Sequence, residues 1–132
     1  MRTLVIATAL VKYDDKYLIA KRSSEKKFSP NEWEFISGFC EEKEQVEETI
    51  LREIKEELCL DGIIGATSAP FIIDELEIRW IIVPYIIDAK SYKFTLNPVD
   101  HSEAKWVDRG GLDRYKELKP FIKGFQEAKL LK

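Results

Sequence analysis

Three glutamates in one segment are the side chains whose types and spacing could do chemistry. Glu53, Glu56 and Glu57 stand three and four residues apart where the pattern is helical, so they share about one third of the helix circumference. Like charges at this spacing repel one another weakly, whereas Mg²⁺ prefers oxygen ligands and is often held by carboxylates together with substrate phosphate. The spacing therefore predicts either a metal site or an acidic, solvated helix face.

Helix geometry alone does not choose between these two interpretations. The chain has 24 Asp and Glu residues, so acidic helix faces are expected without any ligand. Glu48 and Arg52 also have the four-residue spacing of an ordinary surface ion pair. Gly38 precedes the helix, and its missing side chain would let phosphates or a metal approach the backbone.

The spacing from residue 38 to residue 60 resembles the signature of the Nudix hydrolases. That signature is Gly, five residues, Glu, seven residues, then Arg-Glu, an aliphatic residue, any residue, Glu-Glu, any residue, Gly and an aliphatic residue. The chain matches it with Gly38, Glu44 and the run from Arg52 to Leu60, except that Cys59 replaces the second glycine. The flanking sequences at 33–35 and 101–107 are similar to those of MutT-like members.

The resemblance implies an enzyme that depends on Mg²⁺, with Mn²⁺ as a possible substitute, and that cleaves a nucleoside diphosphate linked to another group. A divalent cation would neutralise the diphosphate, orient it and activate water. The implied roles are metal ligands (Glu53, Glu56, Glu57 and the Gly38 carbonyl), an arginine that orients them (Arg52) and a brace for the loop–helix junction (Glu44).

The general base and the substrate contacts are less closely defined. We favour Glu56 as the base, with Glu103 and Asp100 as alternatives that could equally be solvated loop residues. Arg22 could bind phosphate bidentately or be a solvated charge at a strand end, and Phe35 could stack on a base or lie in the core.

Other polar and aromatic residues are expected to be structural. His101, the only histidine, has no visible partner and is expected to be a polar loop residue. The three tryptophans are expected to pack, although an exposed one could stack on a base.

Three residues replace glycines that are frequent in MutT-like proteins. Cys59 stands where the helix would end in a left-handed conformation, so we expect strain of about 1 kcal/mol or a different helix end. Ser37 and Lys43 replace glycines of the preceding loop. These changes are expected to affect loop shape and substrate fit, because none removes a metal ligand.

Within the family, the resemblance favours a MutT-like nucleoside triphosphate pyrophosphohydrolase that yields a monophosphate and pyrophosphate. Its substrate would be 8-oxo-dGTP or a pyrimidine nucleotide, while ADP-ribose and dinucleotide polyphosphates stay open. A Nudix domain that binds nucleotides without catalysis is a further alternative, although such domains usually lose glutamates that this chain keeps.

Length and charge set the wider limits. At 132 residues the chain fits one domain with one core, and we expect a single domain over residues 1–132. The net charge of −3 argues against broad binding to polymeric nucleic acid or anionic membrane, but suits a free nucleotide held through a metal. Whether the protein is a monomer or a homodimer stays open.

Cysteine content and hydropathy bear on location. The two cysteines form neither a metal pattern nor a disulfide framework, and are expected to be thiols in a reducing cytosol. No apolar run reaches the roughly 18 residues of a membrane helix, and the first apolar run is expected to be a strand rather than a signal peptide. We therefore expect a cytoplasmic protein.

The elements that must position these residues follow from hydrophobic periodicity. Apolar residues recur every four positions over 45–58, which predicts the helix that carries the glutamates. Strands are expected at 3–13, 17–21, 33–36, 67–73, 78–88, 92–96 and 104–107, and a closing helix at 119–131. This order favours an α/β (α+β) fold with a mixed β-sheet, and the resemblance implies an α/β/α sandwich.

Overall fold

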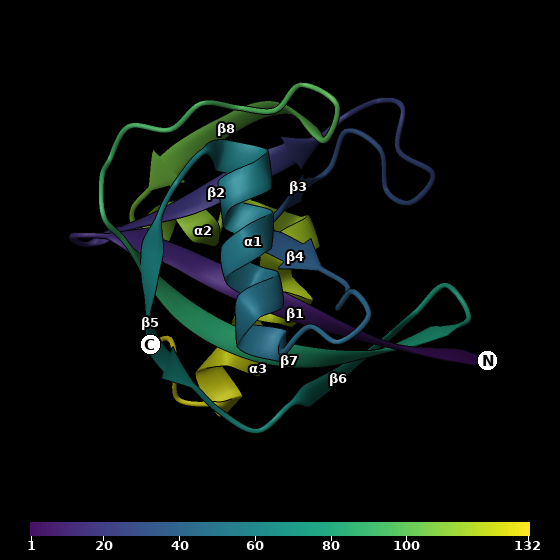
Figure 1. Ribbon diagram of the computed structural model, residues 1–132. Helices are drawn as coiled ribbons and strands as arrows, with labels where there is room; N and C mark the ends of the chain where they lie inside the picture. Colours follow the sequence, from purple (N-terminus) through teal and green to yellow (C-terminus); the bar gives the residue numbers. More distant parts are fainter.

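A mixed sheet of eight strands forms the centre of the computed structural model, which describes residues 1–132 (Figure 1). In chain order, the elements are β1 (Arg2–Tyr13), β2 (Lys16–Arg22), β3 (Trp33–Glu34), β4 (Ile36–Gly38), α1 (Val46–Leu58), β5 (Gly62–Thr67), β6 (Phe71–Glu75), β7 (Ile78–Ala89), β8 (His101–Val107), α2 (Arg109–Leu112), the 3₁₀ helix η1 (Lys116–Leu118) and α3 (Lys119–Glu127).

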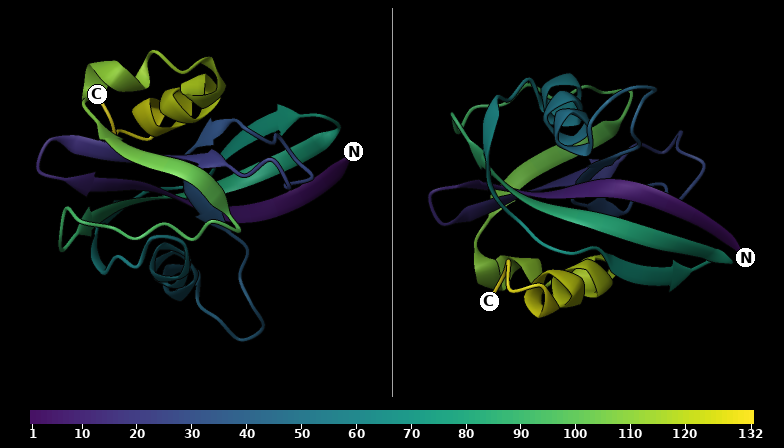
Figure 2. Two further views of the ribbon diagram at one scale, coloured as in Figure 1. Left: turned by 90° about the horizontal axis from the view of Figure 1, so that it is seen from above. Right: turned by 60° about the horizontal axis from the view of Figure 1, so that its bottom comes forward.

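The sheet is built on a long parallel pair, β1 and β7, which is paired from Arg2–Ile78 to Lys12–Asp88. The main strand order is β3-β2-β1-β7-β5, with β4 added to β1, β6 to β7 and β8 to β2. The α1 helix covers one face of the sheet and α3 the other (Figure 2). The expected mixed sheet with helices on its faces is confirmed.

Alternate side chains of β1 point to opposite faces of the sheet and pack in two separate cores, as strand geometry requires. Ala9 and Val11 lie in the core beneath α1, together with Ile50 and Ile54 of that helix. Leu10 points to the opposite face and belongs to the core beneath α3. The apolar run of β1 is thus explained by burial on both sides, as expected of an inner strand.

The glutamate-bearing helix α1 lies where the periodicity predicts it. Gln45 is its N-cap, and it forms a capping box with the side chain of Glu48. The helix ends at Cys59, which has the left-handed conformation (φ 53°) that the family glycine would adopt. Two amides beyond the helix, of Thr95 and Asn97, donate to the carbonyls of Leu58 and Glu57 and satisfy its C-terminal turn.

The strand predicted at 67–73 is wrong. Two strands, β5 and β6, pair one after the other with β7, and residues 68–70 form the loop between them. Pro84 of β7 lies opposite this loop, between the residues that pair with β5 and those that pair with β6. Its missing N–H therefore costs no hydrogen bond between strands. The sequence pattern did not predict β5 because the strand contains Gly62 and Gly65, and glycine is unfavourable in strands.

Two other predicted elements also change. Residues 92–96 form no strand; Tyr92 instead stacks on Trp106, with ring centroids 5.3 Å apart, and its carbonyl accepts from the indole N–H. The closing helix ends at Glu127 rather than at residue 131, and the two glycines at 110–111 lie within α2. None of the helices has the length and apolar character needed to cross a membrane.

Candidate active site

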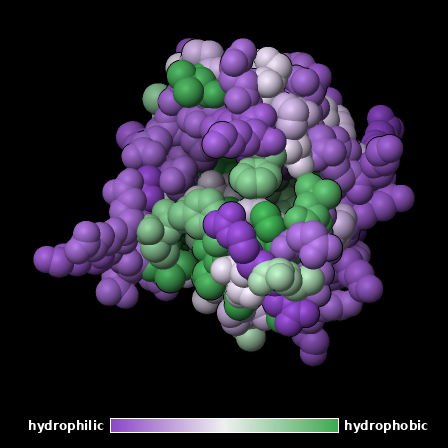
Figure 3. Space-filling view, turned by 90° about the vertical axis from the view of Figure 1, so that its right-hand side faces the viewer, coloured by the Kyte–Doolittle hydropathy of each residue, from purple (hydrophilic) through white to green (hydrophobic).

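A cavity of about 1020 Å³ extends from a group of acidic residues to an apolar end. Figure 3 shows hydrophobic side chains gathered around a hollow, with hydrophilic ones on its rim. The cavity lining includes the polar residues Arg22, Lys26, Glu34, Ser37, Arg52, Glu53, Glu57, Asp100 and His101, and the apolar residues Leu4, Ile6, Phe28, Phe35, Phe39, Trp80 and Ile82.

The end of β4 brings the backbone against the glutamate helix. Gly38 closes this strand and pairs with Ala7 of β1. A Cβ atom at Gly38 would collide with the side chain of Glu53, so only glycine allows this carboxylate to lie over the strand end. The close approach explains why the spacing from Gly38 to the helix matters.

Arg52 ties several acidic side chains together. Its Nε donates to Glu44 Oε2 (2.6 Å), and its Nη1 donates to Glu53 Oε1 (3.0 Å) and Glu56 Oε2 (3.1 Å). Glu44 Oε1 also accepts from the Thr49 hydroxyl (2.7 Å). The hydrogen bonds from Arg52 lower the pKa of Glu44 to about 2.

Glu57 and Glu53 carry the opposite perturbation. Burial raises the pKa of Glu57 to about 9, and the charges of Glu53, Glu34 and Asp100 add to this rise. Burial also raises the pKa of Glu53. The Oε2 atom of Glu57 is buried without a hydrogen-bond partner. A buried carboxyl group with an unsatisfied oxygen, beside a second, half-buried one, is an environment that a cation would stabilise.

The four predicted metal ligands are not all assembled for binding. No three His, Cys, Asp or Glu side chains are grouped in a way that could hold a metal ion. Arg52 occupies one oxygen of Glu53 and one of Glu56, which accounts for this. Glu53 and Glu57, beside the Gly38 backbone, nevertheless fit a hard divalent cation, because Arg52 contacts only one oxygen of Glu53 and the buried Oε2 of Glu57 has no partner.

The three candidate bases lie in different surroundings. Glu56, which the sequence favours, has a 55% exposed side chain and does not line the cavity. Glu103 also lies outside the cavity, where it pairs with Lys21 (3.6 Å), so the structure gives it no place near a substrate. Asp100 does line the cavity and pairs with Lys26 (3.1 Å).

Phe35 is a core residue rather than an open stacking surface. It is only 2% exposed and packs edge-on against Phe121 and Phe125 beneath α3. Arg22 does line the cavity, but its guanidinium already binds Glu34 Oε1 (3.1 Å) and the Phe28 carbonyl (2.8 Å). Its burial leaves Phe35 no open face on which a nucleobase could stack, whereas Arg22 borders the cavity.

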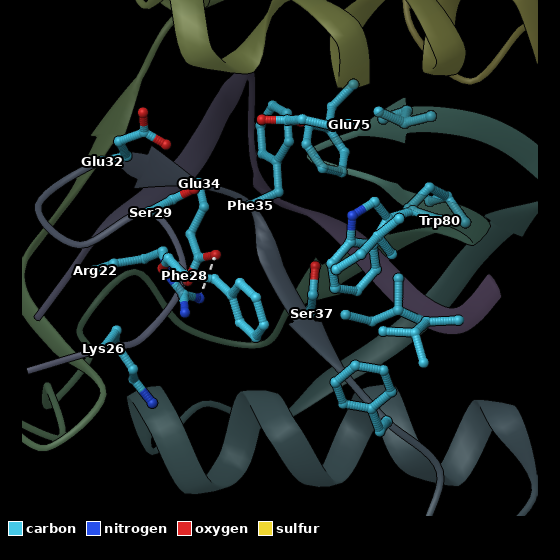
Figure 4. Close-up of a pocket in the computed structure, with 18 of the residues that line it drawn as sticks. Arg22, Lys26, Phe28, Ser29, Glu32, Glu34, Phe35, Ser37, Glu75 and Trp80 are labelled. Carbon is cyan, nitrogen blue, oxygen red and sulfur yellow. Dashed lines mark hydrogen bonds and ion pairs between the residues drawn. The ribbon is translucent and has the colours of Figure 1, made fainter. Parts of the chain in front are cut away.

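The aromatic surface that the sequence did not identify lies at the apolar end. Phe28 and Phe39 are 48% and 50% exposed, and Phe39 packs on Trp80 with ring centroids 6.2 Å apart. Phe28 and Trp80 lie on opposite sides of Ser37 and leave a slot between them (Figure 4). Trp80 and Ile82 are two positions apart in β7 and therefore lie on one face of the sheet. Both line the cavity, so this is the face that meets it.

His101 is not a loop residue. It begins β8, is 1% exposed and forms a 2.8 Å hydrogen bond between its Nε2 and Glu34 Oε2. Its Nδ1 lies 3.7 Å from Glu57 Oε1. The sequence did not show this contact, because the three residues come from β3, α1 and β8 and meet only in the folded chain.

The three residues that replace family glycines differ in conformation. Cys59 and Lys43 have positive φ angles of 53° and 65°, as glycines in these places would. Ser37 lies in β4, where its hydroxyl hydrogen-bonds to that of Thr8 (2.8 Å). Only the first two replacements therefore carry backbone strain.

Known proteins share both the sequence pattern and the fold. The nucleoside triphosphatase NudI of Escherichia coli and that of Shigella flexneri are each 36% identical to this chain over 58 residues. That segment is 44% of this chain and 41% of each relative, so the chain matches less than half the length of these relatives.

Solved structures match over nearly the whole chain. A MutT protein from Methanosarcina mazei has a TM-score of 0.80 and 19% identity, covering 97% of this chain and 94% of its own. The NUDIX domain of Shewanella oneidensis NrtR, solved with ADP-ribose, has a TM-score of 0.77 and 18% identity, covering 96% and 88%. The NUDIX domain family model matches residues 3–126, so the chain belongs to the Nudix hydrolase family.

Proposed function

We propose that this protein is a Mg²⁺-dependent hydrolase of nucleoside triphosphates that releases a nucleoside monophosphate and pyrophosphate. One observation supports the proposal above the others: a single cavity joins the acidic pair Glu53 and Glu57 to the aromatic slot between Phe28 and Trp80. If the phosphates bind at the acidic end through a divalent cation, the nucleobase of the substrate would lie in the slot. The NudI relatives are named nucleoside triphosphatases, in agreement with this substrate class.

The chain's own residues would divide the work between binding and proton transfer. Glu53, Glu57 and the Gly38 carbonyl would hold the cation, joined by Glu56 if its side chain leaves Arg52. The cation, when bound, neutralises the phosphates and activates water. Arg22 and Lys26, which line the cavity, would bind the phosphate oxygens.

Hydrolysis forms one P–O bond and breaks another. The oxygen of water bonds to one phosphorus, the bridging P–O bond breaks, pyrophosphate leaves, and a carboxylate takes the proton of water. We assign this base role to Glu53 in preference to Glu56, since Glu53 lines the cavity and Glu56 does not. Arg52 and Glu44 would orient the carboxylates without touching the substrate.

The experiment that tests the proposal is product analysis on a nucleotide panel with Mg²⁺. The panel contains 8-oxo-dGTP, CTP, dCTP, ADP-ribose and diadenosine polyphosphates, with Glu57→Gln as the inactive control. Pyrophosphate and a monophosphate from one triphosphate, lost in the variant, would support it. Binding of nucleotides without turnover across the panel would contradict it and favour a nucleotide sensor.

ADP-ribose is the second candidate substrate, because a structural neighbour was solved in complex with it. The cavity of about 1020 Å³ is large enough for a nucleotide of that size. Release of AMP from ADP-ribose, with all triphosphates untouched, would move the assignment to this substrate within the same reaction class.

A further inference from the structure

A chain of polar contacts runs through the wall of the cavity from β2 to the glutamate helix. Arg22 Nη1 donates to Glu34 Oε1 (3.1 Å), and Glu34 Oε2 is 2.8 Å from His101 Nε2. The other ring nitrogen of His101 faces Glu57, 3.7 Å from Oε1. Four elements, β2, β3, β8 and α1, thus meet through these side chains.

Strand pairing holds this arrangement in place. Glu34 pairs with Ala20 across β2 and β3, while His101 pairs with Arg22 across β2 and β8, next to a shift of register. The amide of His101 also donates to the Asn97 carbonyl (3.1 Å). The imidazole therefore has a fixed backbone on two sides and little freedom to turn away from Glu57.

His101 faces a carboxyl group with each ring nitrogen. A carboxylate can only accept, so Nε2 donates its hydrogen to Glu34. Nδ1 lies 3.7 Å from Glu57 Oε1, beyond hydrogen-bonding distance, so the ring limits the position of this carboxyl group by packing. His101 Nδ1 and Glu57 Oε2 are the two buried side-chain atoms that have no hydrogen-bond partner, and both belong to residues that line the cavity.

Two unsatisfied buried atoms on neighbouring residues are unusual, because buried polar groups nearly always have partners. Their position at the acidic end of the cavity means that a ligand there would meet both residues. Residues behind a metal-ligating group commonly fix its orientation, and their loss weakens metal binding.

We propose that His101, held by Glu34, is a positioning residue that fixes the Glu57 carboxylate for divalent-cation binding. The inference rests on the proposed function only in taking Glu57 as part of the cation site. His101 takes no part in bond cleavage, and its role is to hold Glu57 in place. Its removal should weaken the cation more than the nucleotide.

The test measures Mn²⁺ binding to the full chain by electron paramagnetic resonance, without nucleotide, in wild type and in His101→Gln. Glutamine can keep a donor toward Glu34 but has no atom equivalent to Nδ1. We expect the Mn²⁺ dissociation constant to rise about 10- to 100-fold. In steady-state assays the Mg²⁺ concentration for half-maximal rate should rise in parallel, with the KM for nucleotide at saturating Mg²⁺ little changed.

Two further variants make the result decisive. Glu34→Ala removes the acceptor that anchors the ring and should weaken Mn²⁺ binding similarly, which covers the case in which His101→Gln fails to fold. Ser102→Ala, an exposed neighbour on β8, is the matched control and should bind like wild type. Folding of each variant is checked by thermal unfolding.

Wild-type Mn²⁺ affinity in folded His101→Gln and Glu34→Ala would overturn the inference, and so would a wild-type protein that binds no Mn²⁺. Weakened binding in both variants supports it even if no nucleotide in the panel is hydrolysed. That last combination would reject the proposed function while leaving the positioning role of His101 in place.

Discussion

At the scale of single residues, Arg52 determines how the acidic side chains of α1 are placed. Its planar guanidinium has five N–H donors and reaches Glu44, Glu53 and Glu56 at once, which the single ammonium of lysine would not do in the same geometry. It holds Glu53 beside the cavity and Glu56 at the exposed surface. Two glutamates three residues apart therefore have different surroundings.

This difference predicts unequal effects on catalysis. We expect Glu53→Gln to reduce kcat by about 10²-fold or more, the usual range for loss of a general base, and Glu56→Gln to reduce it at least ten times less. Initial rates at saturating Mg²⁺ on the preferred nucleotide measure both. Equal losses in the two variants would show that Glu56 turns into the cavity when substrate binds.

Glu44 predicts a pH dependence of stability. Its pKa falls from 4.5 to about 2 on folding, so the folded protein favours the carboxylate form. This stabilisation is complete above the unfolded pKa and is lost as the pH falls from about 4.5 toward 2. The destabilisation of Glu44→Gln, measured by urea unfolding, should therefore be largest near neutral pH and shrink on acidification.

Glu42→Gln, an exposed change in the same loop, is the control for this pH series. A difference between wild type and Glu44→Gln that stays constant from pH 6 to pH 3 would show that the ion pair with Arg52 is not its source.

At the scale of elements, the ends of α1 set the position of its glutamates along the cavity. The capping box at Gln45 begins the helix, and the left-handed Cys59 ends it. The amides of Thr95 and Asn97 donate hydrogen bonds to the carbonyls of Leu58 and Glu57, so the segment after β7 covers the end of the helix. This coverage replaces the strand that the apolar residues of 92–96 predicted.

The left-handed helix end predicts a stabilising substitution. Cys59→Gly should raise the free energy of unfolding by about 0.5 to 1 kcal/mol. Glycine removes the steric cost of the left-handed backbone, and the greater freedom of the unfolded chain offsets part of the gain. Chemical denaturation measures the change. Cys59→Ala is the control, since it removes the thiol, keeps the strain and should show no such gain.

At the scale of the whole molecule, the cavity exists because the layers meet at one end of the sheet. Its wall takes Glu53 and Glu57 from α1, Trp80 from β7 and Phe121 from α3. Charge and apolar surface are thereby separated within one space, which suits a ligand with phosphates at one end and an aromatic base at the other.

The aromatic slot predicts a selective loss of substrate binding. Trp80→Ala should weaken binding by about 1–3 kcal/mol, the usual contribution of base stacking. We expect KM to rise on the order of 10- to 100-fold, with a smaller change in kcat. Trp106→Ala is the matched control, because this tryptophan stacks on Tyr92 away from the cavity. An unchanged KM in Trp80→Ala would show that the nucleobase binds elsewhere.

The sequence by itself determined the residues of the acidic motif, the helix that carries them and the class of fold. These are local properties: a four-residue apolar period and a fixed spacing from Gly38 to Glu57. Apolar runs also located β1 and β7, because strands buried on both faces leave a nearly continuous signal.

Only the tertiary structure decided which of these residues face the cavity. It turned Glu56 outward, buried Phe35 beneath α3, placed Glu103 outside the cavity and brought His101 to Glu57. It also divided residues 62–75 between two strands. The physical reason is that burial and partner choice arise from strand pairing between residues far apart in the chain, which no local spacing encodes.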